Sequence, residues 1–198
     1  VTADSLRKPA FHKHETHEKI DCVIANPPFS LDSWGRDEWI DDPYKRNDYG
    51  LPPKTNGDFA WLLHMITSMK DKTGRVAVVL PHGTLFRGAQ EGIIRKQLLE
   101  KDMIEAVIGL GANIFYGTGI PISIIVIRAS KPKELKNKVL FIDAGEIYTK
   151  GRAQNTMSDE QADEIFELYK NKTDIPEKVK LVDLSDIKEN DFNLNITR

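Results

Sequence analysis

Runs of β-forming residues alternate along this chain with segments of helical periodicity, and this alternation restricts the possible folds more than any other feature. The runs that predict strands are residues 21–25, 75–81, 103–110, 120–129 and 138–144, and the segments that predict helices are 59–69, 89–100 and 158–170. Strands that alternate with helices are typical of an α/β fold with a mostly parallel sheet. Ligands of such sheets bind beyond the carboxyl ends of the strands.

The later strands predict that the sheet is mixed. GLGANIFYGTG, residues 109–119, is a glycine-rich turn that joins two strands, which we expect to be antiparallel. The strand over 138–144 follows at short range and is expected to run antiparallel to the one before it. After Thr173 the chain predicts a short strand and a turn.

Composition excludes several classes of protein. The 198 residues are 40% hydrophobic and 29% charged, which is ordinary for one globular domain. A single cysteine, Cys22, allows no internal disulfide and no cysteine-rich zinc site, and the five scattered histidines predict no dedicated metal site. No apolar run approaches the ~20 residues of a membrane span, and no signal-peptide core is present. The default expectation is a cytoplasmic protein without membrane contact.

Charge gives no general indication of nucleic-acid binding, because the net charge is −2. Basic residues are nevertheless grouped around the second predicted helix (Arg75, Arg87, Arg95 and Lys96) and around residue 135 (Lys131, Lys133, Lys136 and Lys138). Such groups can neutralise phosphates, although they more commonly form solvated surface. Any contact with DNA is therefore expected to be local or shared with a partner.

The segment from Leu31 to Gly57 does not fit the alternation. Its 27 residues include three prolines, three glycines, two tryptophans and charges of both signs. This is long for a connection without structure inside a compact domain. We expect a functional lid or a partly disordered segment at the end of the first predicted strand.

The motif Asn26-Pro27-Pro28-Phe29 directly follows that strand. Asn26 offers a side-chain carbonyl as an acceptor, and the two prolines fix the backbone and leave their carbonyls free to accept. Two fixed acceptors suit a planar NH2 donor, and Phe29 adds a face on which a flat ring can stack. An amine held in this way loses conjugation with its ring and gains nucleophilicity, which suits attack on an electrophilic methyl group. Asn-Pro-Pro is also ordinary turn chemistry, and this reading remains the alternative.

The residues around this motif resemble one family over nearly the whole chain. DCVIANPPFS is similar to motif IV of the amino methyltransferases, in the form found in N6-adenine DNA methyltransferases. The segments GDFAWLLHMITSMKDKTGRVAVVLPHGTLFR, IRKQLLEKDMIEAVIGL, NIFYGTGIPISIIVIRA, VLFIDA and DFNLNITR follow in an order that resembles the modification (M) subunit of type I restriction-modification systems.

The resemblance implies a partial Rossmann-like class I methyltransferase fold. Residues 1–150 would be the catalytic portion of the methyltransferase domain, and residues 151–198 a C-terminal helical extension of the same domain. The implied reaction transfers a methyl group from S-adenosylmethionine to N6 of an adenine flipped out of double-stranded DNA. The implied partners are a specificity subunit, which reads the DNA sequence, and a restriction subunit.

The resemblance also implies roles for individual residues in binding the target base. Asn26 and the carbonyl of Pro27 would accept from the adenine N6, Pro28 would complete the rigid catalytic corner, and Phe29 would stack on the base. Phe115 matches a position from which related enzymes add a second stacking ring. The alternative for Phe115 is an aromatic residue that anchors its loop to the core.

Three further residues would bind the cofactor if the resemblance holds. Asp4 resembles the acidic residue that reads the cofactor's adenine amine, and Asp58 and Phe59 open the helix that borders the cofactor site. Each has a simpler alternative. Asp4 could cap a turn, Asp58 could be a first-turn acid that the helix dipole stabilises, and Phe59 could belong to the core.

The resemblance is incomplete at the start of the chain. An adenine methyltransferase has an upstream strand, a glycine-containing loop and a helix that cradle S-adenosylmethionine, and none of these precedes Val1. We therefore expect a fragment that binds the cofactor weakly and is inactive alone, and a sheet with an exposed apolar edge.

Two other functions remain open. Protein-glutamine and RNA-guanine N-methyltransferases also present a planar amide or amine to Asn-Pro-Pro followed by an aromatic residue, although that residue is usually Tyr. The chain could instead be a non-catalytic module that docks other subunits through the 31–57 segment and the helix near the C-terminus.

Overall fold

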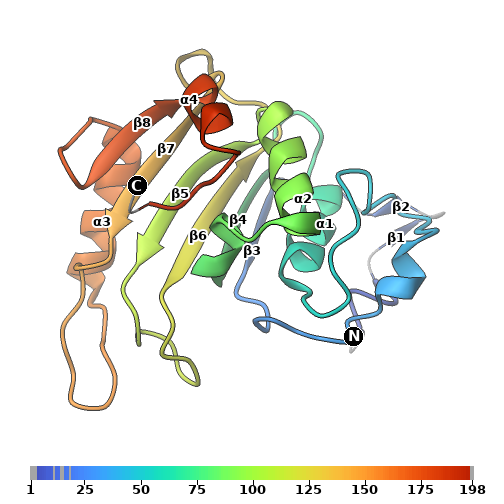
Figure 1. Cartoon of the computed structure of the whole chain (residues 1–198), viewed down its shortest axis with the longest axis horizontal. Coiled ribbons are helices and arrows are strands. Elements are labelled where there is room, and N and C mark those ends of the chain that lie inside the picture. The colour runs from blue at the N-terminus through green and yellow to red at the C-terminus, as the bar shows by residue number, and fades with distance from the viewer. Residues whose placement is uncertain (1–3, 11, 14–15, 18, 197–198) are drawn as a thin grey trace.

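The structure is a computed structural model that describes residues 4–10, 12–13, 16–17 and 19–196. Within these residues, helices pack on both faces of a mixed sheet (Figure 1). Its strands are β3 (Cys22–Ala25), β4 (Arg75–Pro81), β5 (Ile104–Leu110), β6 (Ile122–Arg128), β7 (Lys138–Ala144) and β8 (Val179–Asp183). The helices are α1 (Asp58–Ser68), α2 (Ala89–Glu100), α3 (Asp159–Asn171) and α4 (Leu184–Glu189), with 3-10 turns η1 (Arg36–Trp39), η2 (His82–Leu85) and η3 (Lys133–Leu135), while β1 (His12–Lys13) pairs separately with β2 (Thr16–His17).

The strand order of the main sheet is β3-β4-β6-β5-β7-β8. β3 is parallel to β4 and β5 is parallel to β7, whereas β6 is antiparallel to both β4 and β5. The antiparallel pair predicted from the glycine-rich turn is confirmed. β7 runs opposite to β6, as expected, but it pairs with β5 because residues 129–137 carry the chain across the end of the hairpin. β3, β4, β5 and β7 therefore point the same way, and their carboxyl ends share one edge of the sheet.

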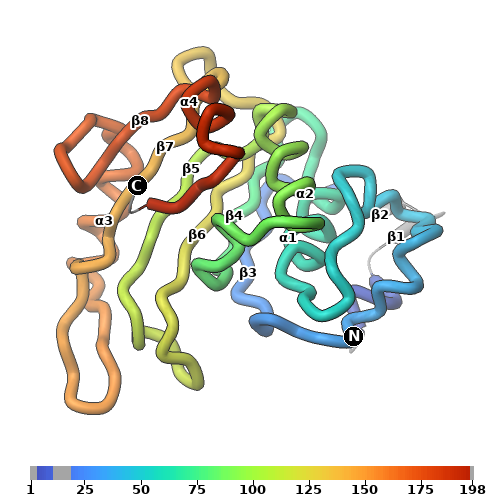
Figure 2. The backbone as a smooth tube through the Cα atoms, viewed as in Figure 1, coloured from blue at the N-terminus to red at the C-terminus, as the bar shows by residue number. Residues whose placement is uncertain are grey.

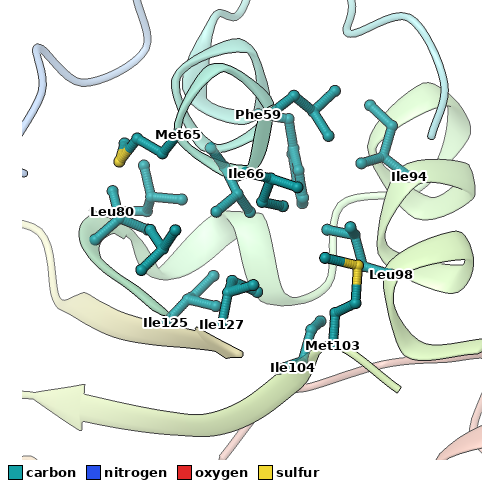
Figure 3. Packing of buried hydrophobic residues seen from close by; sticks show 14 of the residues in the cluster. Phe59, Met65, Ile66, Leu80, Ile94, Leu98, Met103, Ile104, Ile125 and Ile127 are labelled. Atoms are coloured by element: carbon teal, nitrogen blue, oxygen red, sulfur yellow. The ribbon is translucent and has the colours of Figure 1, made fainter. Parts of the chain in front are cut away.

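One core lies between the sheet and helices α1, α2 and α4. Figure 3 shows Phe59 and Ile66 of α1 beside Leu98 of α2, above Ile125 and Ile127 of β6. The two isoleucines are two positions apart and therefore point to the same face of their strand. Burial of each such side chain favours folding by about 1.5–3 kcal/mol.

The second core lies on the opposite face, beneath α3. It includes Ile108 of β5, Val126 of β6, Ile142 of β7 and Ile165 of α3. All residues of β5 are buried because the strand is covered on both faces. This explains why the sequence of β5 is continuously apolar except for Glu105 and does not alternate.

The C-terminal segment returns across the sheet, as the red end of the tube in Figure 2 shows. The amide of Leu194 donates to the carbonyl of Leu85 at 2.9 Å, and a ring nitrogen of His82 lies 3.0 Å from the side-chain oxygen of Asn195. Helix α4, which precedes this segment, was not predicted. Its six residues are too few to display a helical period.

The 31–57 segment is ordered, so the expectation of partial disorder is wrong. Trp34 and Trp39 are buried and their rings meet edge to face at 5.0 Å. The guanidinium of Arg46 lies over the Trp39 ring and forms a buried ion pair of 2.7 Å with Asp42. Trp34 and Trp39, together with Leu6 from the start of the chain, belong to the same core as α1 and α2, so the segment is packed onto the domain.

Two residues of the two basic groups lie inside the protein. Arg95 is 3% exposed and Lys131 is 4% exposed. Arg95 donates to backbone carbonyls, and Lys131 forms an ion pair of 2.7 Å with Asp102. Neither side chain is available to neutralise a phosphate, and neither forms the solvated surface that is the usual alternative.

Candidate active site

The Asn26-Pro27-Pro28-Phe29 corner lies at the carboxyl end of β3, on the edge of the sheet where ligands of α/β proteins bind. Asn26 and Pro28 are exposed, Pro27 is buried and Phe29 is half-buried. Within the described part of the chain, no hydrogen bond involves the Asn26 side chain. Its amide is thus accessible to a ligand on a backbone that two prolines restrict.

The two aromatic residues predicted to stack on a base contact the same core. Phe29 follows β3 and Phe115 lies in the β5–β6 turn, and both pack against the cluster beneath α3. Both are only half-buried. The structure therefore combines the anchoring role of Phe115 with a partly exposed ring at the carboxyl edge.

Asp58, the first residue of α1, is fully buried and binds the backbone directly after the corner. Its Oδ1 accepts a hydrogen bond of 2.7 Å from the amide of Ser30, which directly follows Phe29. Its Oδ2 accepts from Arg87 at 3.1 Å. Phe59 is 2% exposed and belongs to the core. Neither Asp58 nor Phe59 offers an exposed surface to a cofactor in this arrangement.

Arg87 joins Asp58 to a second buried carboxylate. The guanidinium lies 3.1 Å from an oxygen of Glu91, which is 4% exposed. Burial raises the pKa of Glu91 above its usual value, and the positive charge of Arg87 offsets part of this effect. Arg95 donates to the carbonyl of Arg87 at 2.9 Å and so fixes the backbone of its neighbour.

Comparison with known proteins identifies the family. The N-6 DNA methylase family matches residues 1–198. The chain belongs to that family. Relatives include the type I restriction enzyme MjaVII methylase subunit of Methanocaldococcus jannaschii, 38% identical over 98% of this chain and 34% of the relative, and the HindI methylase subunit of Haemophilus influenzae, 34% identical over 97% of this chain and 43% of the relative.

Solved structures agree with this assignment. The type I methyltransferase subunit of Streptococcus thermophilus superposes with a TM-score of 0.88 at 41% identity, over 98% of this chain and 41% of that one. The EcoKI M protein shares the fold, with a TM-score of 0.65 at 17% identity. The methyltransferase fold is thereby confirmed. The chain spans 34% to 43% of the length of the two relatives described above and 41% of the first structure.

Asp4 is an exposed turn residue in this N-6 DNA methylase chain. Its Oδ1 accepts from the amides of Leu6 and Arg7, each at 3.1 Å, which is the capping role given as its alternative. Its Oδ2 lies 3.8 Å from the Arg7 side chain. A cofactor role for Asp4 stays a prediction.

The sequence does not predict three residues of the site, namely Ser30, Arg87 and Glu91. Asp58 is 28 residues from Ser30 and 29 from Arg87 along the chain, so no local spacing reveals the cluster. Arg87 and Glu91 are four residues apart, which in a helix would favour an ion pair, but this signal is common on protein surfaces. The structure distinguishes this pair from a surface pair, because Glu91 is buried and Arg87 is partly buried.

The described residues contain no group of three or more His, Cys, Asp or Glu side chains placed to hold a metal ion. No described helix has the length and apolar character required to cross a membrane.

Proposed function

We propose that this chain forms the target-base portion of an adenine-N6 DNA methyltransferase, within the modification subunit of a type I restriction-modification system. The observation that carries the proposal is the exposed Asn26 amide on the rigid Pro27-Pro28 corner, with Phe29 beside it. Family membership supports adenine in DNA over glutamine in protein or guanine in RNA as the substrate. We assign residues 1–150 to the catalytic portion and 151–198 to its extension.

In this proposal the corner acts by binding and orienting the amine. The side-chain oxygen of Asn26 and the carbonyl of Pro27 each accept a hydrogen bond from the adenine N6 amine. These two hydrogen bonds direct the nitrogen lone pair away from conjugation with the adenine ring. Phe29 holds the flipped base by stacking, and Phe115 is placed to limit its movement from the other loop. Since two acceptors orient the amine, no general base is needed before methyl transfer.

S-adenosylmethionine would supply the electrophilic methyl group. Of the residues considered for it, Asp4 fits best because it is exposed and its Oδ2 has no hydrogen bond within the described residues. Asp58 and Phe59 fit less well, since both are buried. We assign Asp4 to the adenine amine of the cofactor and give Asp58 a different role below.

The proposed partners follow from the relatives, which are named as methylase subunits of type I restriction enzymes. We propose double-stranded DNA as the substrate, a specificity subunit that selects its sequence and a restriction subunit in the complete assembly. The proposed location is the cytoplasm, where host DNA is methylated.

The test is Asn26→Ala in the full open reading frame that encodes these residues. Methyl transfer to DNA should be abolished, while the affinity for S-adenosylmethionine stays unchanged, because Asn26 contacts the target amine. Protection of the DNA from the cognate restriction enzyme measures the first quantity, and calorimetry measures the second. A variant that still protects DNA would contradict the proposal.

A further inference from the structure

The Asn26–Phe29 corner is held at both ends. Before it, Ala25 of β3 pairs with Val78 of β4. After it, Ser30 adopts a left-handed backbone conformation with φ of 50°, which is unfavourable for a residue with a side chain. The hydrogen bond from the Ser30 amide to Asp58 stabilises this conformation. The direction of the chain after Phe29 therefore depends on Asp58.

The Asp58 carboxylate is itself fixed by charge. It is 0% exposed, and one nitrogen of Arg87 contacts both Asp58 and Glu91 at 3.1 Å. A buried carboxylate is costly unless it is paired and hydrogen-bonded, so Asp58 depends on Arg87. Arg87 is in turn held from α2 by Glu91, whose side chain is four residues further along.

We propose that Asp58 and Arg87 are positioning residues for the Asn26–Phe29 corner, with Glu91 holding Arg87 in place. The inference rests on the function proposed above and deepens it. Asp58 acts on the corner through its hydrogen bond with the Ser30 amide, and touches neither the base nor the cofactor. Asp58, Arg87 and Glu91 connect the end of β3 to α1 and α2. In this way they fix the position of the Asn26 side-chain amide.

Asp102 provides a matched control at the opposite edge of the sheet. It precedes β5, and its Oδ1 accepts from the amide of Asn137 at 3.1 Å and from buried Lys131 at 2.7 Å. The amide donor Asn137 has a positive φ of 54°, as Ser30 has in the corner, and Asp102 itself has a φ of 55°. Asp102→Ala therefore removes a comparable interaction, a carboxylate that binds one backbone amide and one cation, at the other end of the strands.

The experiment measures single-turnover methyl transfer by the full open reading frame, purified with its specificity subunit. The DNA is a duplex that carries the site found methylated in host DNA by single-molecule sequencing. Asp58→Ala should lower the rate constant roughly 10- to 100-fold, the effect expected of a small misplacement of reacting groups. The Kd of S-adenosylmethionine should be unchanged. Asp102→Ala should leave the rate constant unchanged even where it lowers Tm.

Conservative variants separate positioning from stability. Asp58→Asn can still accept from Ser30 and should recover part of the rate, whereas Arg87→Gln should lose rate because Asp58 is left unpaired. These two variants decide the question if Asp58→Ala does not fold. A role confined to stability lowers the fraction of active enzyme, which the burst amplitude reports when DNA is in excess over enzyme, and leaves the single-turnover rate constant unchanged.

The proposal is overturned if the folded Asp58 and Arg87 variants keep the wild-type rate constant, or if Asp102→Ala loses rate to the same extent. Failure of the proposed function gives a different result. In that case the wild-type protein itself would not methylate adenine, or Asn26→Ala would leave methylation unchanged.

Discussion

Single residues of the Asn26–Phe29 corner differ in exposure in a way that suits binding of a flat amine. Asn26 is exposed while Pro27, next to it, is buried. The prolines restrict the backbone before any ligand arrives, so less conformational entropy would be lost if the Asn26 amide bound the proposed target amine. Phe29 is half-buried, which fixes its ring against the core and leaves part of it for stacking.

Phe29→Ala should weaken binding of the extruded base by about 1–3 kcal/mol, the usual effect of losing one aromatic stacking partner. The measurement compares the affinity of wild-type and variant full-length protein for duplexes with an intact or abasic target. Wild-type protein should prefer the intact site, and the variant should lose most of that preference. An equal preference in both proteins would argue against stacking.

The pH dependence of stability tests the buried state of Glu91. Burial raises the pKa of Glu91 in the folded protein. Glu91 therefore contributes fully to the free energy of unfolding below its unfolded pKa of about 4.3. This contribution is lost as pH rises through the folded pKa. Glu91→Gln removes this titration. The free energy of unfolding should therefore fall less for the variant than for wild type between pH 4 and pH 8, as measured by urea denaturation. Parallel curves would show that Glu91 titrates normally.

The site could be predicted from the sequence only where its residues are adjacent along the chain. Asn26 to Phe29 form one continuous motif whose chemistry can be read directly. The family resemblance implies a cofactor role for Asp58, whereas its burial and its contact with Ser30 depend on packing between separate elements and cannot be predicted from the sequence. No pattern in the sequence distinguishes a buried Arg87 from a solvated one.

At the scale of elements, the 31–57 segment is held in place mainly by side-chain contacts, because its only regular element is the 3-10 turn η1. Trp39 is fully buried, its indole nitrogen donates to the carbonyl of Leu6 at 2.8 Å, and Arg46 stacks on its ring. These contacts tie the segment to the start of the chain. A role as a lid over the corner stays a prediction.

Trp39→Ala should destabilise this chain by about 3–5 kcal/mol, the range for removal of a buried aromatic side chain. Ile40→Ala is the control, because the neighbouring Ile40 is 53% exposed. Chemical denaturation monitored by far-UV circular dichroism gives both values. Similar losses for the two variants would contradict the central place of Trp39 in the segment.

Helix α3 is attached to the sheet through a buried polar contact as well as its apolar stripe. The Tyr169 hydroxyl donates to Glu105 of β5, which also pairs with Arg128 of β6. Burial, together with the Glu105 carboxylate, raises the pKa of Tyr169 to about 12. The protonated hydroxyl therefore stabilises docking of α3.

This pKa predicts an alkaline loss of stability. The contribution of Tyr169 is fully present below the unfolded pKa of about 10 and is lost as pH rises through the folded value of about 12. Tyr169→Phe should be less stable than wild type at pH 8, and the difference should shrink by pH 11. Thermal unfolding at both pH values checks this. A constant difference would mean that the hydroxyl does not titrate with folding.

At the scale of the whole chain, β3 is the terminal strand of the sheet that the described residues form. Among the described strands, β3 pairs only with β4, and its Ile24 is 79% exposed. The expected apolar edge is therefore present. Unpaired backbone groups beside an apolar side chain favour pairing with another strand.

Ile24→Lys should reduce self-association of this chain, because a charge on an edge strand opposes edge-to-edge pairing. Ile93→Lys, on the exposed surface of α2, is the control, since Ile93 is 57% exposed but lies on no sheet edge. Sedimentation velocity over a range of concentrations measures the effect. Equal behaviour of the two variants would assign any association to a different surface.

The sequence predicts the individual long elements better than the strand order and the short C-terminal helix. β4, α2 and β7 coincide with the predicted ranges because their apolar patterns are long and bounded by turn residues. The partner of β7 was not predictable, since strand order depends on the path of a connection and not on local pattern. α4 is too short to leave a periodic signal.

The central claim is that the corner after β3 binds the target amine. The most direct measurement is a crystal structure of the full-length protein bound to duplex DNA and a nonreactive cofactor analogue. The account predicts the adenine N6 within about 3.2 Å of both the Asn26 side-chain oxygen and the Pro27 carbonyl, with its ring stacked on Phe29. An extruded adenine bound elsewhere, with Asn26 facing solvent, would contradict it.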